Sequence, residues 1–136
     1  MAAALYLDTS AILRGVLESG LSPDIERRIA AAPALLTSRL ALVESSRALM
    51  RVRQMTRVSE TRLADVARQL DALWARCDMW ELTPAVCDLA AVIAPSKPLR
   101  ALDALHLATY LIARRALGDI ELLTADARLR DAAERE

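Results

Sequence analysis

The feature that most constrains this fold is the alternation of short apolar runs with longer helical patterns. The runs cover residues 3–7, 34–37, 79–82 and 120–124. Each has the length of a strand, and the segments between them are long enough to hold a helix. Strands separated by helices pair in parallel, because the crossover brings the chain back in the same direction. The pattern therefore predicts an α/β sandwich built on a mainly parallel sheet.

Capping residues and prolines indicate where the helices begin. Ser22 and Pro23 precede one helix, Ser38 and Ser59 cap two more, and Pro84 begins another. We expect helices over residues 11–18, 23–31, 38–53 and 59–77. A further helix begins at Pro84, a long one follows residues 96–98 and ends at Gly118, and a last one follows the final strand. These signals leave no linker, so we expect a single domain over residues 1–136.

Composition limits the kinds of partner that this chain can attract. Lys and Arg number 18, Asp and Glu also number 18, and the net charge is zero. Nucleic acid would therefore have to bind through a local patch. Only 3% of the residues are aromatic, which argues against a surface of base-stacking side chains. The first basic residue is Arg14, so the beginning of the chain does not look like a signal peptide, and we expect a cytoplasmic protein.

Four of the acidic residues stand in apolar surroundings. Asp8 and Asp126 each follow an expected strand, and parallel strands bring their carboxyl ends to one edge of the sheet. Glu44 and Asp103 lie within apolar stretches of two expected helices. Each acid has a purely structural alternative. The three Asp side chains could cap helices, and Glu44 could pair with Arg47 or Arg51.

Taken together, the four acids favour a metal site. A buried carboxylate needs a compensating partner, and one arginine cannot neutralise four of them. Oxygen ligands alone suit Mg²⁺ or Mn²⁺, whereas zinc would require His or Cys clusters that this sequence lacks. A cation of this kind can activate water and offset charge on a phosphodiester. The acids therefore predict metal-dependent phosphoryl chemistry.

Two weaker signals have more than one interpretation. Five arginines, including Arg47, Arg51 and Arg53, fall within residues 47–62, which could contact RNA phosphates, an acidic partner or only solvent. His106 lies one turn after Asp103, and we interpret it as a histidine that packs between helices, since no nucleophile motif accompanies it.

Four short segments lie around the four acids: residues 5–12, 42–44, 102–108 and 123–129. In sequence and in order along the chain, these segments resemble the PIN-domain ribonucleases, and among them the VapC toxins of bacterial type II toxin–antitoxin pairs. The resemblance implies a three-layer α/β/α fold and an endoribonuclease that depends on Mg²⁺ or Mn²⁺. It also implies a homodimer and a small antitoxin partner.

The resemblance carries over to particular residues. Asp8, Glu44, Asp103 and Asp126 match the acidic cluster that binds metal and catalyses cleavage, and Thr9, Ser10 and Thr124 match polar positions beside it. The alternative is a PIN-like module that has no catalytic activity and binds a partner or RNA. The presence of all four acids favours the nuclease.

Overall fold

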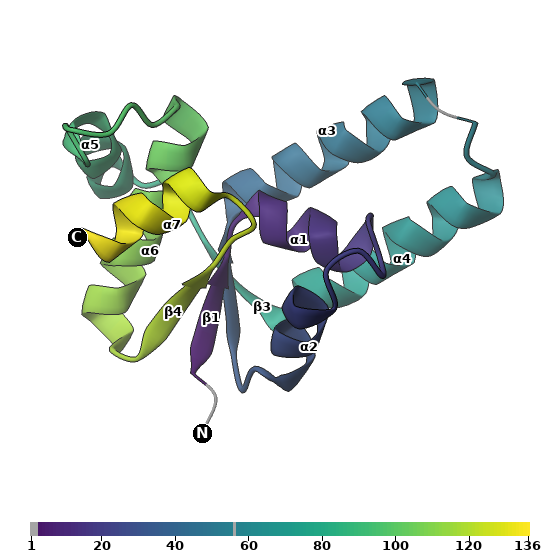
Figure 1. Ribbon diagram of the computed structural model, residues 1–136, viewed down its shortest axis with the longest axis horizontal. Coiled ribbons are helices and arrows are strands. Elements are labelled where there is room, and N and C mark those ends of the chain that lie inside the picture. The colour runs from purple at the N-terminus through teal and green to yellow at the C-terminus, as the bar shows by residue number, and fades with distance from the viewer. Residues whose placement is uncertain (1–2, 56) are drawn as a thin grey trace.

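The computed structural model describes residues 3–55 and 57–136 and contains a sheet of four parallel strands. They are β1 (Ala4–Leu7), β2 (Leu35–Ser38), β3 (Cys77–Trp80) and β4 (Ile120–Leu123), in the order β3-β2-β1-β4. Leu5 of β1 pairs with Leu35 of β2 and with Glu121 of β4. The predicted α/β fold is confirmed, and Figure 1 shows helices on both sides of the sheet.

Seven helices connect and flank the strands in the described part of the chain. They are α1 (Thr9–Val16), α2 (Pro23–Ala31), α3 (Arg39–Met55), α4 (Glu60–Arg76), α5 (Pro84–Val92), α6 (Ala101–Leu117) and α7 (Ala127–Glu134). Ser59 and Thr83 cap α4 and α5 through their side chains, while Gly118 ends α6 with a positive φ of 90°. That conformation is costly for residues with a Cβ, so glycine suits this position.

Several boundaries differ by one or two residues from those expected, and two of the differences have a clear physical cause. The third strand begins at Cys77, two residues before the expected range, because α4 ends at Arg76 and Cys77 is already extended and pairs with Leu35. The first helix begins at Thr9, since the Asp8 side chain accepts a hydrogen bond from the backbone N–H of Ala11. In both places a tertiary or capping contact decides where the element begins.

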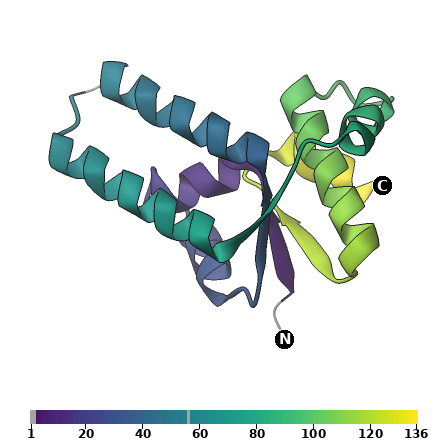
Figure 2. The same cartoon turned by 180° about the vertical axis from the view of Figure 1, so that it is seen from behind.

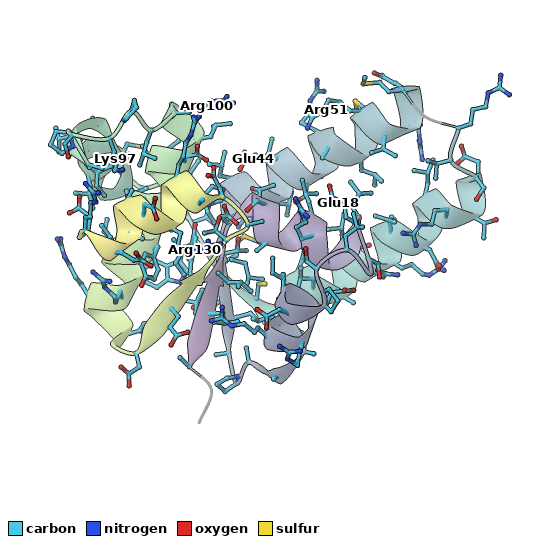
Figure 3. The ribbon with its side chains drawn as sticks, in the orientation of Figure 1. Glu18, Glu44, Arg51, Lys97, Arg100 and Arg130 are labelled. Carbon is cyan, nitrogen blue, oxygen red and sulfur yellow. The ribbon has the colours of Figure 1, made fainter. Side chains whose placement is uncertain are left out.

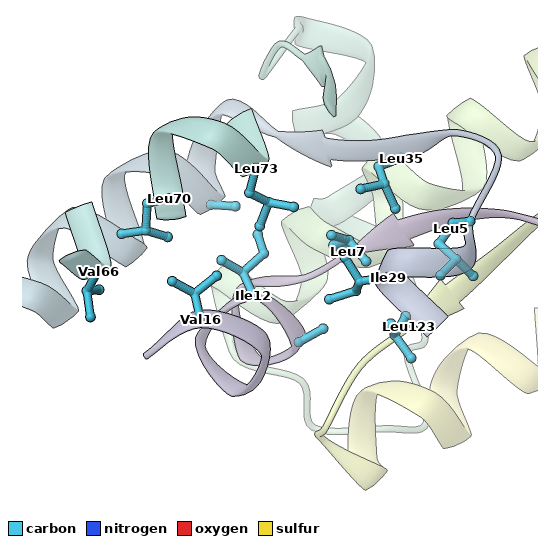
Figure 4. Packing of buried hydrophobic residues seen from close by; sticks show 13 residues of the cluster. Leu5, Leu7, Ile12, Val16, Ile29, Leu35, Val66, Leu70, Leu73 and Leu123 are labelled. Atoms are coloured by element: carbon cyan, nitrogen blue, oxygen red, sulfur yellow. The ribbon is translucent and has the colours of Figure 1, made fainter. Parts of the chain in front are cut away.

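The sheet separates two hydrophobic clusters, because successive side chains of a strand point to opposite faces. Leu5, Leu7 and Leu35 face the cluster that includes Ile12 of α1 and Leu70 of α4, which Figure 4 shows from close by. Tyr6 and Leu36 face the second cluster, together with Leu107 of α6 and Leu129 of α7. The molecule therefore has three layers, as expected.

Helices α3 and α4 extend beyond the rest of the molecule (Figures 1 and 2). An open groove of about 260 Å³ lies between them and is lined by side chains that include Leu49 and Trp74. In the described part of the chain, the helices are too short or too polar to cross a membrane.

Candidate active site

The strand order defines a particular edge of the sheet. The chain moves from β1 to β2 and β3 on one side, then returns to place β4 on the other side of β1. In open α/β sheets, ligands bind outside the carboxyl ends of the strands at such a point of reversal. Asp8 directly follows β1, and Asp126 lies just beyond β4. The fold thus brings these two predicted residues to the same edge.

Asp8 is buried, with 3% of its surface exposed, and is surrounded by donors. Its Oδ1 accepts hydrogen bonds from the backbone N–H of Ala11 at 3.0 Å and from the Ser10 hydroxyl at 2.8 Å. Its Oδ2 accepts from the Thr124 hydroxyl at 2.7 Å. Asp8 therefore caps α1, as the structural alternative proposed, and is also fixed by two predicted supporting residues.

Ser10 and Thr124 also join the ends of β1 and β4 to each other. Their hydroxyl oxygens are 3.1 Å apart. The backbone N–H of Ala125 donates to Ser10, and that of Asp126 donates to Thr124. This network sets the path of the chain that leads from β4 to Asp126.

Asp126 itself is the N-cap of α7, and its Oδ1 accepts a hydrogen bond from the backbone N–H of Arg128 at 2.9 Å. The capping interpretation thus describes Asp126 as well as Asp8. It is wrong for Asp103, which lies in the first turn of α6, where Arg100 holds the N-cap position.

Glu44 reaches the same region from α3. Its Oε1 accepts hydrogen bonds from the Thr9 hydroxyl at 2.5 Å and from Nε2 of His106 at 2.8 Å. Burial raises the pKa of Glu44, but the hydrogen bonds from His106 and Thr9 outweigh it, and the net pKa lies below its ordinary value. The alternative in which Glu44 pairs with Arg47 or Arg51 is wrong, because its side-chain partners in the described structure are His106 and Thr9.

The surroundings of Asp103 disfavour its charged form. Burial raises the pKa of its carboxyl group, and the negative charges of Asp126, Asp8 and Glu44 raise it further. Its carboxylate accepts no hydrogen bond from the described residues. Asp103, Asp126 and Glu44 line one open cleft of about 540 Å³. The four predicted acids therefore lie around one site and interact through their charges.

Two arginines line this cleft beside the acids. They are Arg100, at the start of α6, and Arg128, in the first turn of α7. In the described part of the chain neither guanidinium makes an ion pair or a side-chain hydrogen bond. Composition gave no reason to single out these two among so many arginines.

The three arginines that the sequence singled out lie on α3. Arg47, Arg51 and Arg53 are exposed, and Arg53 lines the groove between α3 and α4, 3.8 Å from Glu60. Figure 3 shows Arg51 farther out along α3 than Glu44, while Arg100 lies on the α6 side of the site. The structure thus separates these arginines from the ones beside the acids.

The interpretation of His106 as a histidine that packs between helices is confirmed by its burial, but it leaves out the hydrogen bonds of the ring. It is 2% exposed and does lie among packed helices, but its ring makes hydrogen bonds with Tyr6, Thr9 and Glu44. The Asp103–His106 spacing placed it near the site along one helix. It could not reveal the partners that β1, α1 and α3 supply.

The donor set fits a hydrated divalent cation. In the described ranges, 3–55 and 57–136, no three His, Cys, Asp or Glu side chains come close enough to hold a metal among themselves. Mg²⁺ does not need such a cage, because it keeps several waters and binds through one or two carboxylates. Charges that repel one another around an open cleft, with no arginine paired to Asp8, Asp103 or Asp126 in the described structure, suit a cation of this kind.

An α/β/α sandwich with polar side chains at the carboxyl edge of its sheet belongs to the class of proteins that bind their ligands at that edge. The family model for the PIN domain matches residues 5–135. Ribonuclease VapC46 of Mycobacterium tuberculosis is 35% identical over 132 residues, which are 96% of this chain and 91% of that protein. The chain therefore belongs to the PIN-domain family, in its VapC group.

Two solved structures share the fold at lower identity. VapC20 of Mycobacterium tuberculosis, a toxin that cleaves the sarcin–ricin loop, matches with a TM-score of 0.64 and 18% identity over 94% of each chain. A toxin–antitoxin complex from Klebsiella pneumoniae matches with a TM-score of 0.63 and 19% identity, covering 91% of this chain and 87% of that one. At these identities the likeness supports the fold.

Proposed function

We propose that this chain is a divalent-metal-dependent endoribonuclease that acts as the toxin of a type II toxin–antitoxin pair. The observation that carries the proposal is the cleft lined by Glu44, Asp103 and Asp126, with Asp8 fixed at its edge. Kinship with proteins named as VapC ribonucleases supports RNA as the substrate. The cytoplasm, where RNA is plentiful, is the proposed place of action.

The four acids would hold Mg²⁺ or Mn²⁺, which when bound supplies an activated water and offsets phosphodiester charge. Ser10 and Thr124 donate to Asp8, so its oxygens are fixed before any ligand arrives. Thr9 donates to Glu44 and restrains it in the same way. Preorganised ligands of this kind reduce the cost of ordering the site during binding.

The RNA backbone would be held by arginines. Arg100 and Arg128 share the cleft with the acids and are free to meet phosphates. Arg47, Arg51 and Arg53 on α3 would contact more distant parts of the strand, which is one of the interpretations that the sequence left open.

The test is RNA cleavage by the purified chain, free of any partner, with Mg²⁺, with Mn²⁺ and with excess EDTA. We expect cleavage only with a divalent cation, and Asp103→Asn should abolish it. Asp119→Asn is the matched control, because it removes the same charge from an exposed residue at the opposite end of the sheet. Undiminished cleavage in EDTA contradicts metal dependence. Inactivity under all conditions favours a PIN-like module that only binds.

A small antitoxin and a second copy of the chain are the proposed protein partners. The matching Klebsiella complex, which contains a toxin and an antitoxin, supports the first of these. Exposed apolar side chains on α3, such as Val43 and Met50, offer surface for such contacts. Light scattering at micromolar concentration should give the mass of a dimer, and a monomer would refute that part of the proposal.

A further inference from the structure

His106 connects four elements of the fold and contacts Glu44, which lines the cleft. It lies on α6, is 2% exposed, and is the only histidine in the sequence. Its Nδ1 is 2.9 Å from the Tyr6 hydroxyl on β1, and its Nε2 is 2.8 Å from Glu44 Oε1 on α3. Thr9 of α1 lies 3.1 Å from the same Nε2. Polar groups this deeply buried must be matched donor to acceptor.

This requirement determines which atoms carry the hydrogens in the contacts of His106. The Glu44 carboxylate can only accept, so Nε2 of His106 must carry the hydrogen that lies between them. A neutral imidazole then has a bare Nδ1, which accepts from the Tyr6 hydroxyl. Burial raises the pKa of Tyr6 far above its ordinary value, so this hydroxyl keeps its hydrogen. The contacts of His106 with Tyr6 and with Glu44, and that of Thr9 with Glu44, then each have one donor and one acceptor.

The two ends of the Glu44 carboxylate have different surroundings. Oε1 receives hydrogen bonds from both His106 and Thr9. Oε2 accepts none from the described residues, and the Glu44 side chain is 23% exposed where it lines the cleft. One oxygen is therefore tethered to the interior, and the other is left for a ligand.

We propose that His106 is a positioning residue: its Nε2–H holds Oε1 of Glu44 so that Oε2 is presented to the cleft, and Tyr6 fixes the ring tautomer. The proposal rests on the proposed function, since Glu44 is one of the acids assigned to it. Partners that orient a metal-binding carboxylate or histidine typically contribute about 10–100-fold to activity or metal affinity.

The single histidine makes the tautomer directly measurable. In protein labelled with ¹⁵N at histidine, long-range ¹H–¹⁵N spectra at neutral pH should show a single imidazole with Nε2 protonated and Nδ1 bare. An imidazole protonated at Nδ1, or an equal mixture of tautomers, would overturn the proposal. This measurement needs no RNA, so it decides the positioning role even if the chain cleaves none.

Kinetics test the consequence for the reaction. We expect His106→Leu to lower kcat by about 10–100-fold while KM stays within about twofold. His106→Gln should restore most of kcat, because its amide N–H can still donate to Glu44. Equal losses for the Leu and Gln variants would contradict positioning and indicate a packing role.

A pair of tyrosine variants controls for the general effect of removing a buried hydroxyl group. Tyr6→Phe should lower kcat, whereas Tyr110→Phe should not. Tyr110 is also buried and packs against Tyr6, but its hydroxyl bonds to the Ile120 carbonyl and not to His106. The same kcat for both variants would overturn the role of Tyr6. An inactive wild type with the expected tautomer would contradict the ribonuclease proposal alone.

Discussion

At the scale of single residues, Asp8 and Asp103 carry the same charge in opposite environments. Asp8 receives hydrogen bonds from two hydroxyl groups and a backbone N–H. Asp103 receives none within the described structure, and the negative charges around it raise its pKa. The energetic cost of assembling the acidic site is therefore concentrated at Asp103.

This difference predicts that Asp103→Asn stabilises the metal-free protein. Because the folded-state pKa of Asp103 is raised, the native state holds its proton more tightly than the unfolded state does, and stability falls as the pH rises through that pKa. Asn at this position is uncharged, so it removes the energetic cost of holding a carboxylate in these surroundings. We expect a gain of about 0.5 kcal/mol at neutral pH, a small value because the group is partly solvated.

Urea unfolding in EDTA at a series of pH values measures this gain. The free energy of unfolding of Asp103→Asn should exceed that of the wild type at pH values above the raised pKa. The two curves should converge as the pH falls and Asp103 of the wild type becomes protonated. A difference that stays constant with pH would show that charge is not its cause.

For Asp8 the same substitution should have the opposite effect on stability. Thr124 accepts the N–H of Asp126, so its hydroxyl hydrogen points to Oδ2 of Asp8. An Asn amide group in place of Oδ2 would point its N–H at the Thr124 hydroxyl hydrogen, so two donors would meet without an acceptor. We expect Asp8→Asn to destabilise the metal-free protein by about 1–2 kcal/mol, although relief of repulsion alone would stabilise it. Thermal melts in EDTA check this, and a raised Tm would contradict it.

At the scale of elements, the predictions succeeded where the signal is local. Ser59 and Thr83 cap their helices with their own side chains, and Pro84 begins α5, so the sequence near each start is sufficient. The start of β3 was wrong because Cys77 continues the apolar repeat of α4. Its extended conformation is fixed by pairing with Leu35, a contact that no local pattern contains.

The same reasoning explains which site residues the sequence could identify. Asp8 and Asp126 follow strands, so parallel pairing was enough to bring them together. Asp103 and Glu44 required the packing of α6 and α3 against that edge, which the resemblance supplied. The contact of His106 with Tyr6 joins residues 100 positions apart, and only the folded structure shows it.

Two sets of arginines are proposed to contact the RNA backbone, and their contributions can be compared directly. Arg100→Gln and Arg128→Gln remove charge beside the acids, whereas Arg47→Gln and Arg51→Gln remove the same charge from α3. We expect substitution of the cleft pair to weaken RNA binding more, and each cleft substitution to reduce the slope of log affinity against log salt by about 0.7. Filter-binding titrations with inactive protein check this, and larger effects on α3 would place the RNA along that helix.

At the scale of the whole molecule, the sheet order explains why the acids meet. β1 is central, with β2 and β4 as its neighbours, so the residues after β1 and β4 emerge side by side. The hydrophobic clusters on both faces hold α3 and α6 against this edge and keep Glu44 and Asp103 in place. The favourable free energy of folding from the rest of the molecule offsets the repulsion between the acids.

A bound cation should therefore be visible in the unfolding of the whole chain. A ligand that binds only the folded state stabilises it by about 2.7 kcal/mol when present at 100 times its Kd. We expect Mg²⁺ to raise the Tm of the wild type and of Asp119→Asn equally, and that of Asp103→Asn much less. The order of stability should thus reverse: Asp103→Asn melts above the wild type in EDTA and below it in excess Mg²⁺. Equal Mg²⁺ shifts for all three proteins would show that Asp103 does not take part in binding the cation, whatever its effect on RNA cleavage.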